Sequence, residues 1–238
     1  MNCSMLLLAR SYLTFFALSV VLSSKSTFAQ DNLIIMSERV GGVSVRTTEE
    51  ELSKLYGKDN VSRKIRAWGD GGVGCATVLF AGTSKELSIF WREADLDYDS
   101  SPSPAQIAKC ETLPTRRLPA SIEIETNFEK KPPQIPSYWK TPEGVFVGMS
   151  LFQLEEINGA PVEFESSPSC FDGGILGWNG GKLEKRKDLF NYSRISYPSG
   201  EIEKIKKSAK ISSKDLTKSL KKKIYLGNLE ISFPSPEK

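Results

Sequence analysis

An internal repeat constrains the fold of this 238-residue chain more than any other feature. When the sequence is shifted by 102 positions, residues 42–57 align with residues 144–159, and the glycines at both ends of the two segments coincide. With no gap introduced, Asp70 and the two glycines after it fall on Asp172 and the two glycines after it. Helix signals, apolar positions and turn signals that match in one register indicate two copies of one structural unit.

Each copy carries the signals of one short, capped helix. In the second copy Ser150 is a favourable N-cap, and Gln153 stands three positions later, which is the spacing of a capping box. Gly159 supplies the left-handed residue that ends helices, and Pro161 prevents the helix from continuing. The first copy repeats the same box from Thr48 onward. We therefore expect one short helix in each copy.

Strand patterns surround both predicted helices, because runs rich in β-branched and aromatic residues are bounded by turn residues. Asn179 followed by Gly180 favours a two-residue hairpin turn between two of these runs. One helix with several antiparallel strands predicts an α+β unit. The expected fold is thus two tandem repeats, each a short helix packed on a curved antiparallel sheet. The main expected strands are residues 75–80, 87–91, 106–113, 121–126, 162–165, 174–178, 182–187, 189–197 and 223–233.

The first 29 residues have the pattern of a signal peptide. Arg10 precedes a mostly apolar run over residues 12–22, and small residues lead to a cleavage site near Ala29. The uninterrupted apolar run is about half of the ~20 residues that a membrane-spanning helix needs. We therefore expect a secreted or periplasmic protein with no integral membrane segment after cleavage.

Proline clustering separates the two copies. Three prolines within five positions at residues 132–136 cannot join the interior of a sheet, so residues 127–142 are predicted to be a stiff linker. The expected domain organisation is a signal peptide over residues 1–29, a first repeat over 30–126, this linker, and a second repeat over 143–238.

Charge and composition exclude several classes of function. Removing Arg10 and Lys25 with the signal peptide leaves 30 of the 32 basic residues against 29 acidic ones, so a dedicated nucleic-acid binder is not expected. The chain contains no histidine, which removes the commonest general base and the commonest metal ligand. We expect no enzyme activity, no metal and no cofactor.

Three cysteines follow the signal peptide, and an odd number in an oxidising compartment suggests one bridge and one free thiol. Cys75 and Cys110 are the candidate disulfide because both lie in the first half of the chain. If the two lay on strands separated by a third, however, their Cα atoms would be ~9–10 Å apart and too distant to bond. The third cysteine is Cys170, and the disulfide pairing among Cys75, Cys110 and Cys170 therefore stays open at this point.

Two acidic features invite catalytic or metal interpretations. Asp70 and Asp172 are interpreted as structural turn residues that accept backbone hydrogen bonds, and a catalytic carboxylate pair is the weaker alternative. The carboxylates of Asp95–Asp99 have the alternate spacing of a calcium loop. Ser100 stands where such a loop needs glycine, so we interpret this segment as a solvated acidic loop.

A lysine-rich segment over residues 201–223 is the candidate surface-binding element. Apolar residues interrupt it at regular spacing, so it is either the solvated face of a packed arm or a patch for anionic lipid or cell-wall polymer. The candidate residues for such binding are Lys206, Lys207, Lys221 and Lys222.

The segment from Gly148 to Pro161 resembles the signature helix of the outer-membrane assembly lipoproteins of the SmpA/OmlA (BamE-like) type. The tandem-repeat beta-lactamase inhibitor proteins carry a similar helix, and their two-unit layout is closer to this chain. The resemblance covers about fourteen residues, and no lipid-attachment cysteine is present. It implies a binding scaffold without catalysis and identifies no partner.

The sequence therefore predicts an exported, noncatalytic binding protein with an unidentified protein partner, which it contacts through the concave face of a sheet. One alternative is an envelope-associated protein held peripherally to an anionic surface by residues 201–223. The weaker alternative is a hydrolase that uses carboxylates.

Overall fold

The computed structural model describes residues 31–68, 72–92, 103–112, 117–125, 136–165, 173–190, 193–196 and 209–235, and the structural statements below concern these residues. Its strands are β1 (Ile34–Ile35), β2 (Arg39–Val40), β3 (Val43–Ser44), β4 (Val61–Trp68), β5 (Gly72–Leu79), β6 (Leu87–Trp91), β7 (Pro119–Glu125), β8 (Glu163–Glu165), β9 (Ile175–Gly177), β10 (Ser193–Ser196), β11 (Lys210–Ser212) and β12 (Tyr225–Ser232). Its helices are α1 (Glu49–Tyr56), α2 (Pro104–Thr112), α3 (Leu151–Asn158), α4 (Lys187–Phe190) and α5 (Lys218–Lys221), with 3-10 turns at Lys58–Asn60, Lys182–Lys185 and Ser213–Asp215.

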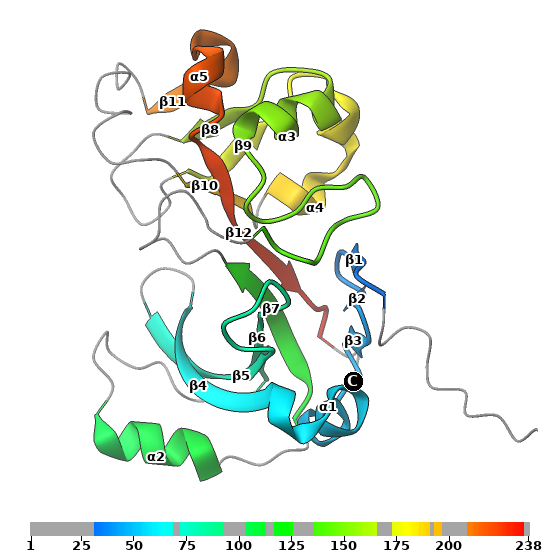
Figure 1. The fold of residues 1–238 in the computed structure, drawn as a ribbon, viewed down its shortest axis with the longest axis vertical. Coiled ribbons are helices and arrows are strands. Elements are labelled where there is room, and N and C mark those ends of the chain that lie inside the picture. The colour runs from blue at the N-terminus through cyan, green and yellow to red at the C-terminus, as the bar shows by residue number, and fades with distance from the viewer. Residues whose placement is uncertain are drawn as a thin grey trace, which may run out of the picture.

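The largest sheet has six antiparallel strands in the order β10-β12-β7-β6-β5-β4. Strand β12 lies between β7 and β10, so the last strand of the chain joins strands from both predicted copies (Figure 1). Two three-stranded sheets, β1-β2-β3 and β11-β8-β9, flank it. A bridge between Gly174 and Arg194 connects the β9 end of the second small sheet to β10.

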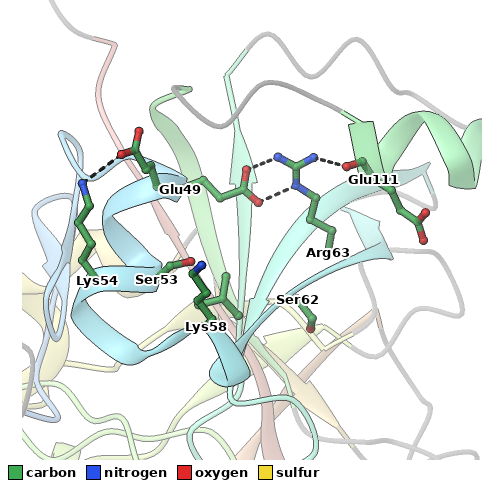
Figure 2. A pocket seen from close by; sticks show the side chains of 9 residues that line it. Glu49, Ser53, Lys54, Lys58, Ser62, Arg63 and Glu111 are labelled. Atoms are coloured by element: carbon green, nitrogen blue, oxygen red, sulfur yellow. Dashed lines mark hydrogen bonds and ion pairs between the residues drawn. The ribbon is translucent and has the colours of Figure 1, made fainter.

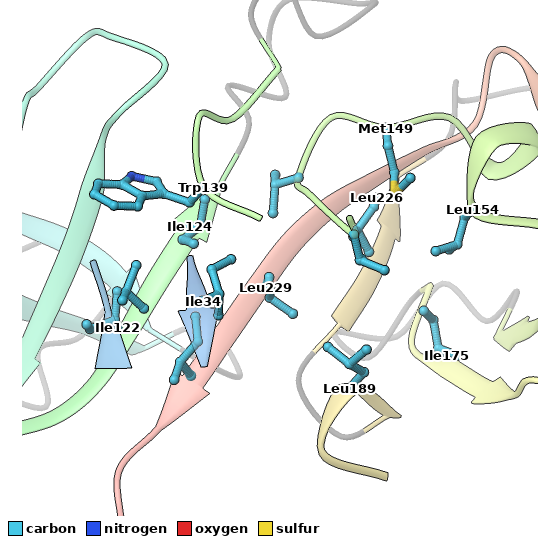
Figure 3. Packing of buried hydrophobic residues seen from close by; sticks show 14 of the residues in the cluster. Ile34, Ile122, Ile124, Trp139, Met149, Leu154, Ile175, Leu189, Leu226 and Leu229 are labelled. Carbon is cyan, nitrogen blue, oxygen red and sulfur yellow. The ribbon is translucent and has the colours of Figure 1, made fainter. Parts of the chain in front are cut away.

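The main hydrophobic core runs through both halves of the molecule, and a second, small cluster surrounds Cys75 and Cys110. Ile34 and Ile122 from the first half and Leu154 and Ile175 from the second belong to the same buried cluster. Figure 3 shows β12 crossing this cluster between the two sets of side chains. Trp139, at the end of the predicted linker, is only 2% exposed and donates its indole N–H to the carbonyl of Lys85 at 2.9 Å. The end of that segment is therefore part of the core.

Both predicted helices are confirmed, together with their caps. Thr48 accepts a hydrogen bond from the Glu51 N–H, while the Glu51 carboxylate accepts the N–H of Thr48 at 2.8 Å. Ser150 and Gln153 make the same reciprocal pair at the start of α3. Gly159 ends α3 in the left-handed conformation, at φ 72°. The capping signals are local, so they are visible in the sequence without knowledge of the tertiary structure.

The predicted strand over residues 106–113 is wrong, because this segment forms α2. Ser103 and Gln106 make a third reciprocal pair: the Ser103 N–H donates to Gln106 Oε1 at 2.7 Å, and the Gln106 N–H donates to Ser103 Oγ at 3.3 Å. Pro104 occupies the first helical position, where its missing N–H has no consequence.

The predicted hairpin around Asn179 is half right. Asn179 and Gly180 both have positive φ, 49° and 74°, as that turn requires. The expected second arm over residues 182–187 is wrong, because a 3-10 turn stands there. The fully buried Asn158 accounts for the difference, since its Oδ1 accepts the Leu183 N–H at 3.0 Å and draws the chain toward α3.

The α+β class is confirmed, since the described residues form helices and three antiparallel sheets. The segments that follow α1 and α3 differ in extent, however. Strand β4 has eight residues and β8 has three. The equivalence of the two halves as repeats stays a prediction.

Candidate binding site

A hollow of about 630 Å³ lies between α1 and β4, close to the C-terminal end of α2 (Figure 2). Its lining comes from four separate elements. Glu50 and Lys54 of α1, Lys58 of the following 3-10 turn, Ser62 of β4 and Glu111 of α2 are among the residues that line it. Most of these side chains are charged or polar, so the hollow suits a polar or mixed surface.

One wall of the hollow is a buried ion pair between Glu49 and Arg63. The Arg63 guanidinium donates from Nε to Glu49 Oε1 at 2.8 Å and from Nη2 to Oε2 at 2.6 Å, and Glu49 is 5% exposed. Thr77 Oγ1 donates to the same carboxylate, and the Trp91 indole donates to Thr77 at 2.8 Å. The hydrogen bond to Glu49 raises the pKa of Arg63. Because both carboxylate oxygens have donors, this pair is a fixed structural element.

The remaining nitrogen of the Arg63 guanidinium, Nη1, attaches α2 to the sheet. Arg63 Nη1 donates to the carbonyls of Cys110 at 3.1 Å and Glu111 at 2.8 Å. A cation is favourable there because the last carbonyls of a helix lack partners within the helix. A disulfide joins Cys75 of β5 to Cys110 of α2, with Cα atoms 5.4 Å apart. The two cysteines are close enough to bond because Cys110 lies on a helix and not on a strand separated from β5 by a third strand.

The rim of the hollow is more exposed. Glu50 and Lys54 form an ion pair at 3.0 Å with side chains 52% and 70% exposed. Such pairs contribute about 0–1 kcal/mol because water screens them. A partner's charges can therefore replace these contacts at little cost.

Strand β4 forms one end of the six-stranded sheet. Asn60 and Phe80 lie opposite each other in the register of β4 and β5, and the Phe80 N–H donates to the Asn60 carbonyl at 2.9 Å. Hydrogen-bonded pairs alternate along an antiparallel ladder, so the N–H and C=O groups of Arg63 and Ile65 face away from β5. Within the described ranges, neither residue has a backbone hydrogen bond on that outer side.

A second polar cluster lies on the six-stranded sheet where β7 meets β12. The Asn228 amide donates to Glu123 at 2.6 Å and to Glu125 at 3.3 Å. Burial, followed by the charge of Glu125, raises the pKa of Glu123 from 4.5 to about 8, with Glu230 adding to the rise and Arg194 opposing it. Burial also raises the pKa of Glu125. The cluster therefore binds a proton near neutral pH, at the junction of the two halves of the chain.

The lysines of the predicted surface-binding segment have different surroundings. Lys221 donates to both oxygens of Glu155 at 2.9 and 2.7 Å, and Ser213 donates to the same carboxylate. This ion pair holds α5 against α3. Lys222 is exposed, and its ammonium lies 5.7 Å from the centre of the Phe152 ring.

Several residues singled out from the sequence lie outside the described part of the chain. These are the cleavage site at Ala29, the turn residues Asp70 and Asp172, the Asp95–Asp99 loop, Cys170, and the candidate surface residues Lys206 and Lys207.

Within the described ranges, no group of three or more carboxylate or cysteine side chains is arranged to hold a metal ion. No helix in the same ranges combines the length and the apolar character needed to cross a membrane.

Sequence reasoning missed the pairing of Glu49 with Arg63, and no spacing rule could have found it. An acidic residue at the start of a helix is already explained by the helix dipole. For the Glu123 and Glu125 cluster a usable signal exists, because both alternate with Ile122 and Ile124 on one strand.

No protein-family model, curated protein or solved structure matches this chain. The resemblance to the SmpA/OmlA and beta-lactamase inhibitor families therefore stays a prediction from the segment Gly148 to Pro161.

Proposed function

We propose that the chain is an exported, noncatalytic protein-binding module, and that its contact surface is centred on the hollow between α1 and β4. The observation that carries this proposal is the combination of a preformed hollow with an adjacent strand edge. The outer main-chain groups of Arg63 and Ile65 have no backbone partner there among the described residues. Main-chain groups at a free edge are ready to bind another chain.

The chemistry of the hollow supports binding and not catalysis. Its most buried carboxylate, Glu49, is held by Arg63 and Thr77 and is occupied by these donors. The exposed groups of its lining, Glu50, Lys54, Lys58 and Glu111, are suited to contact with a partner's polar side chains. Rigid walls with exchangeable rim charges favour a preorganised interface, which reduces the entropic cost of association.

We also propose that the two halves descend from one duplicated unit. Support comes from the reciprocal caps of α1 and α3, which use the same positions in the repeat register. Each helix is followed by an antiparallel strand pair, β4 with β5 and β8 with β9.

A site-specific cross-linking experiment tests the binding function. A photo-reactive residue at position 58 should capture a protein from solubilised envelopes of the source cells, and the same residue at position 214, on the far 3-10 turn, should not. Ser53→Trp, which fills the hollow, should abolish the capture. Ser219→Trp is the matched control, because it changes an exposed helical serine of α5. Equal capture from both positions, or capture that survives Ser53→Trp, contradicts the proposal.

A second candidate function is attachment to an anionic envelope surface through the lysine-rich end of the molecule. The observation favouring it is a group of exposed lysines around α5, namely Lys214, Lys218, Lys222 and Lys223. Binding to vesicles that contain anionic lipid should weaken steeply between low and physiological salt if these lysines carry the attachment. Lys218→Gln combined with Lys222→Gln should reduce binding further, and unchanged binding argues against this function.

A further inference from the structure

We infer that β4 binds an extended segment of the partner protein as a seventh strand of the large sheet. The segment fits best if apolar and acidic side chains alternate along it. This inference rests on the proposed binding function and deepens it by naming the kind of segment that is recognised.

The two ends of the six-stranded sheet are not equivalent. At the β10 end, the Ile195 N–H donates to the Gly173 carbonyl at 2.6 Å, which continues the pairing toward β9. At the β4 end, the N–H and C=O groups of Arg63 and Ile65 point outward. They alternate with the groups of Lys64, which pair inward with β5. An added strand can therefore form hydrogen bonds at two successive outward-facing residues of β4.

The hollow reaches this edge. Ser62 and Arg63 are neighbours in β4, so their side chains lie on opposite faces of the sheet. Both residues nevertheless line the hollow. Two successive residues of the edge strand thus border the hollow, which lies alongside this part of β4. The hollow thus offers space for a chain beside Val61 and Arg63, between α1 on one side and the C-terminal end of α2 on the other (Figure 2).

The side chains of β4 define the chemistry of the incoming segment. Lys64 is exposed on one face, so an acidic side chain opposite it is favourable. Val61 and Ile65 are half-buried on the other face, and Ile65 packs beside the Cys75–Cys110 bridge. Apolar side chains opposite these two extend that packing. Successive residues of a strand point to opposite faces, which gives the alternating pattern.

A second copy of the chain is a poorer occupant of the same edge. Antiparallel pairing of β4 with itself, centred on Lys64, brings the exposed Lys64 of one copy directly against Lys64 of the other. Like charges directly opposite each other destabilise a strand pair. A lysine on an edge strand is a known means of preventing self-association. The exposed lysine of β4 therefore disfavours pairing between two copies of this chain and favours pairing with an acidic strand.

The test uses the ¹⁵N-labelled chain and the synthetic peptide acetyl-Thr-Val-Glu-Val-Glu-Val-Thr-amide as the probe. At saturating peptide, hydrogen exchange at the Arg63 and Ile65 amides should slow at least tenfold, whereas the Lys64 and Arg66 amides should change little because they already pair with β5. A peptide N-methylated at alternate residues, which cannot pair with the edge, should bind at least tenfold more weakly. Lys64→Glu should weaken the acidic peptide about two- to fivefold and strengthen its lysine counterpart by a similar factor.

Equal affinity for the N-methylated peptide, or unchanged exchange at Arg63 and Ile65, overturns strand addition. So does slow exchange at both residues in a dimer of the free chain, which would make a second copy the occupant. If cross-linking at position 58 still captures a partner in that event, the binding function stands and only the strand mode falls. If the peptide protects both amides but no partner is captured, strand addition stands and the proposed cellular role falls.

Discussion

Replacing Glu123 by glutamine should abolish most of the dependence of stability on pH near neutrality. Glutamine imitates the protonated carboxyl group and keeps an oxygen that can accept the hydrogen bond from Asn228. The groups that face Glu123 are Glu125, Glu230, Arg194 and Asn228, so the carboxylate has more acidic than basic neighbours. The variant keeps this partly buried position neutral at every pH, whereas the wild-type carboxyl group becomes charged above about pH 8.

Because the pKa of Glu123 is raised in the folded state, the free energy of unfolding should decrease as the pH rises. The folded protein holds a proton on Glu123 up to about pH 8, whereas the unfolded chain releases it near pH 4.5. Between these values the folded state binds more protons, so stability decreases as the pH rises and becomes constant above about pH 8. The full difference of about 3.5 pKa units corresponds to at most about 5 kcal/mol. We expect about 2–3 kcal/mol, because the side chain is partly exposed and solvent screens its charge.

Urea unfolding followed by tryptophan fluorescence, between about pH 5 and pH 9, measures the effect. The chain has four tryptophans and no histidine, so no side chain with an ordinary pKa near 6.5 interferes in this range. The wild-type free energy of unfolding should fall by about 2–3 kcal/mol across the range, while that of Glu123→Gln should fall by less than half as much, with the contribution of Glu125 remaining. Glu38→Gln, at an exposed turn, is the control and should retain the wild-type slope. A variant that keeps that slope refutes the assignment of the proton to Glu123.

Three further substitutions probe the structure. Arg63→Ala leaves the buried carboxylate of Glu49 without its cation and should lower the free energy of unfolding by about 3–5 kcal/mol in urea titrations. Asn158→Ala removes three hydrogen bonds to the main chain and should cost about 2–4 kcal/mol, seen as a lower melting temperature. Cys75→Ser combined with Cys110→Ser should cost about 3–4 kcal/mol, and adding a dithiol reductant should then have no further effect on the urea midpoint. A loss below about 1 kcal/mol in any of these cases contradicts the role assigned to that group.

Local signals predicted local structure well. The caps at Thr48 and Ser150 and the turn at Asn179 depend on neighbouring residues only, and each is present. The error in residues 106–113 has the same origin, because Ser103 and Gln106 carry the capping pattern that was recognised elsewhere. The strand prediction for this segment did not take that pattern into account.

Features that depend on distant pairing were not predictable. Nothing near Glu123 indicates that Asn228 lies opposite its strand, since 105 positions separate them. The hollow likewise depends on the placement of α1 and α2 on either side of Arg63. Most of the candidate site is therefore a property of the tertiary arrangement and not of any motif.

The position of β12 between β7 and β10 has a consequence for how the chain folds. The pairing of Ile122 with Ile231 closes a loop of more than one hundred residues, and such closure is slow compared with local hairpins. Until β12 pairs with them, β7 and β10 each have an unpaired strand edge that can bind other chains. We therefore expect both halves of the chain to fold together, and only after β12 has been synthesised. A version shortened before Tyr225 would be lost to aggregation as a whole, with neither half surviving as a folded remnant.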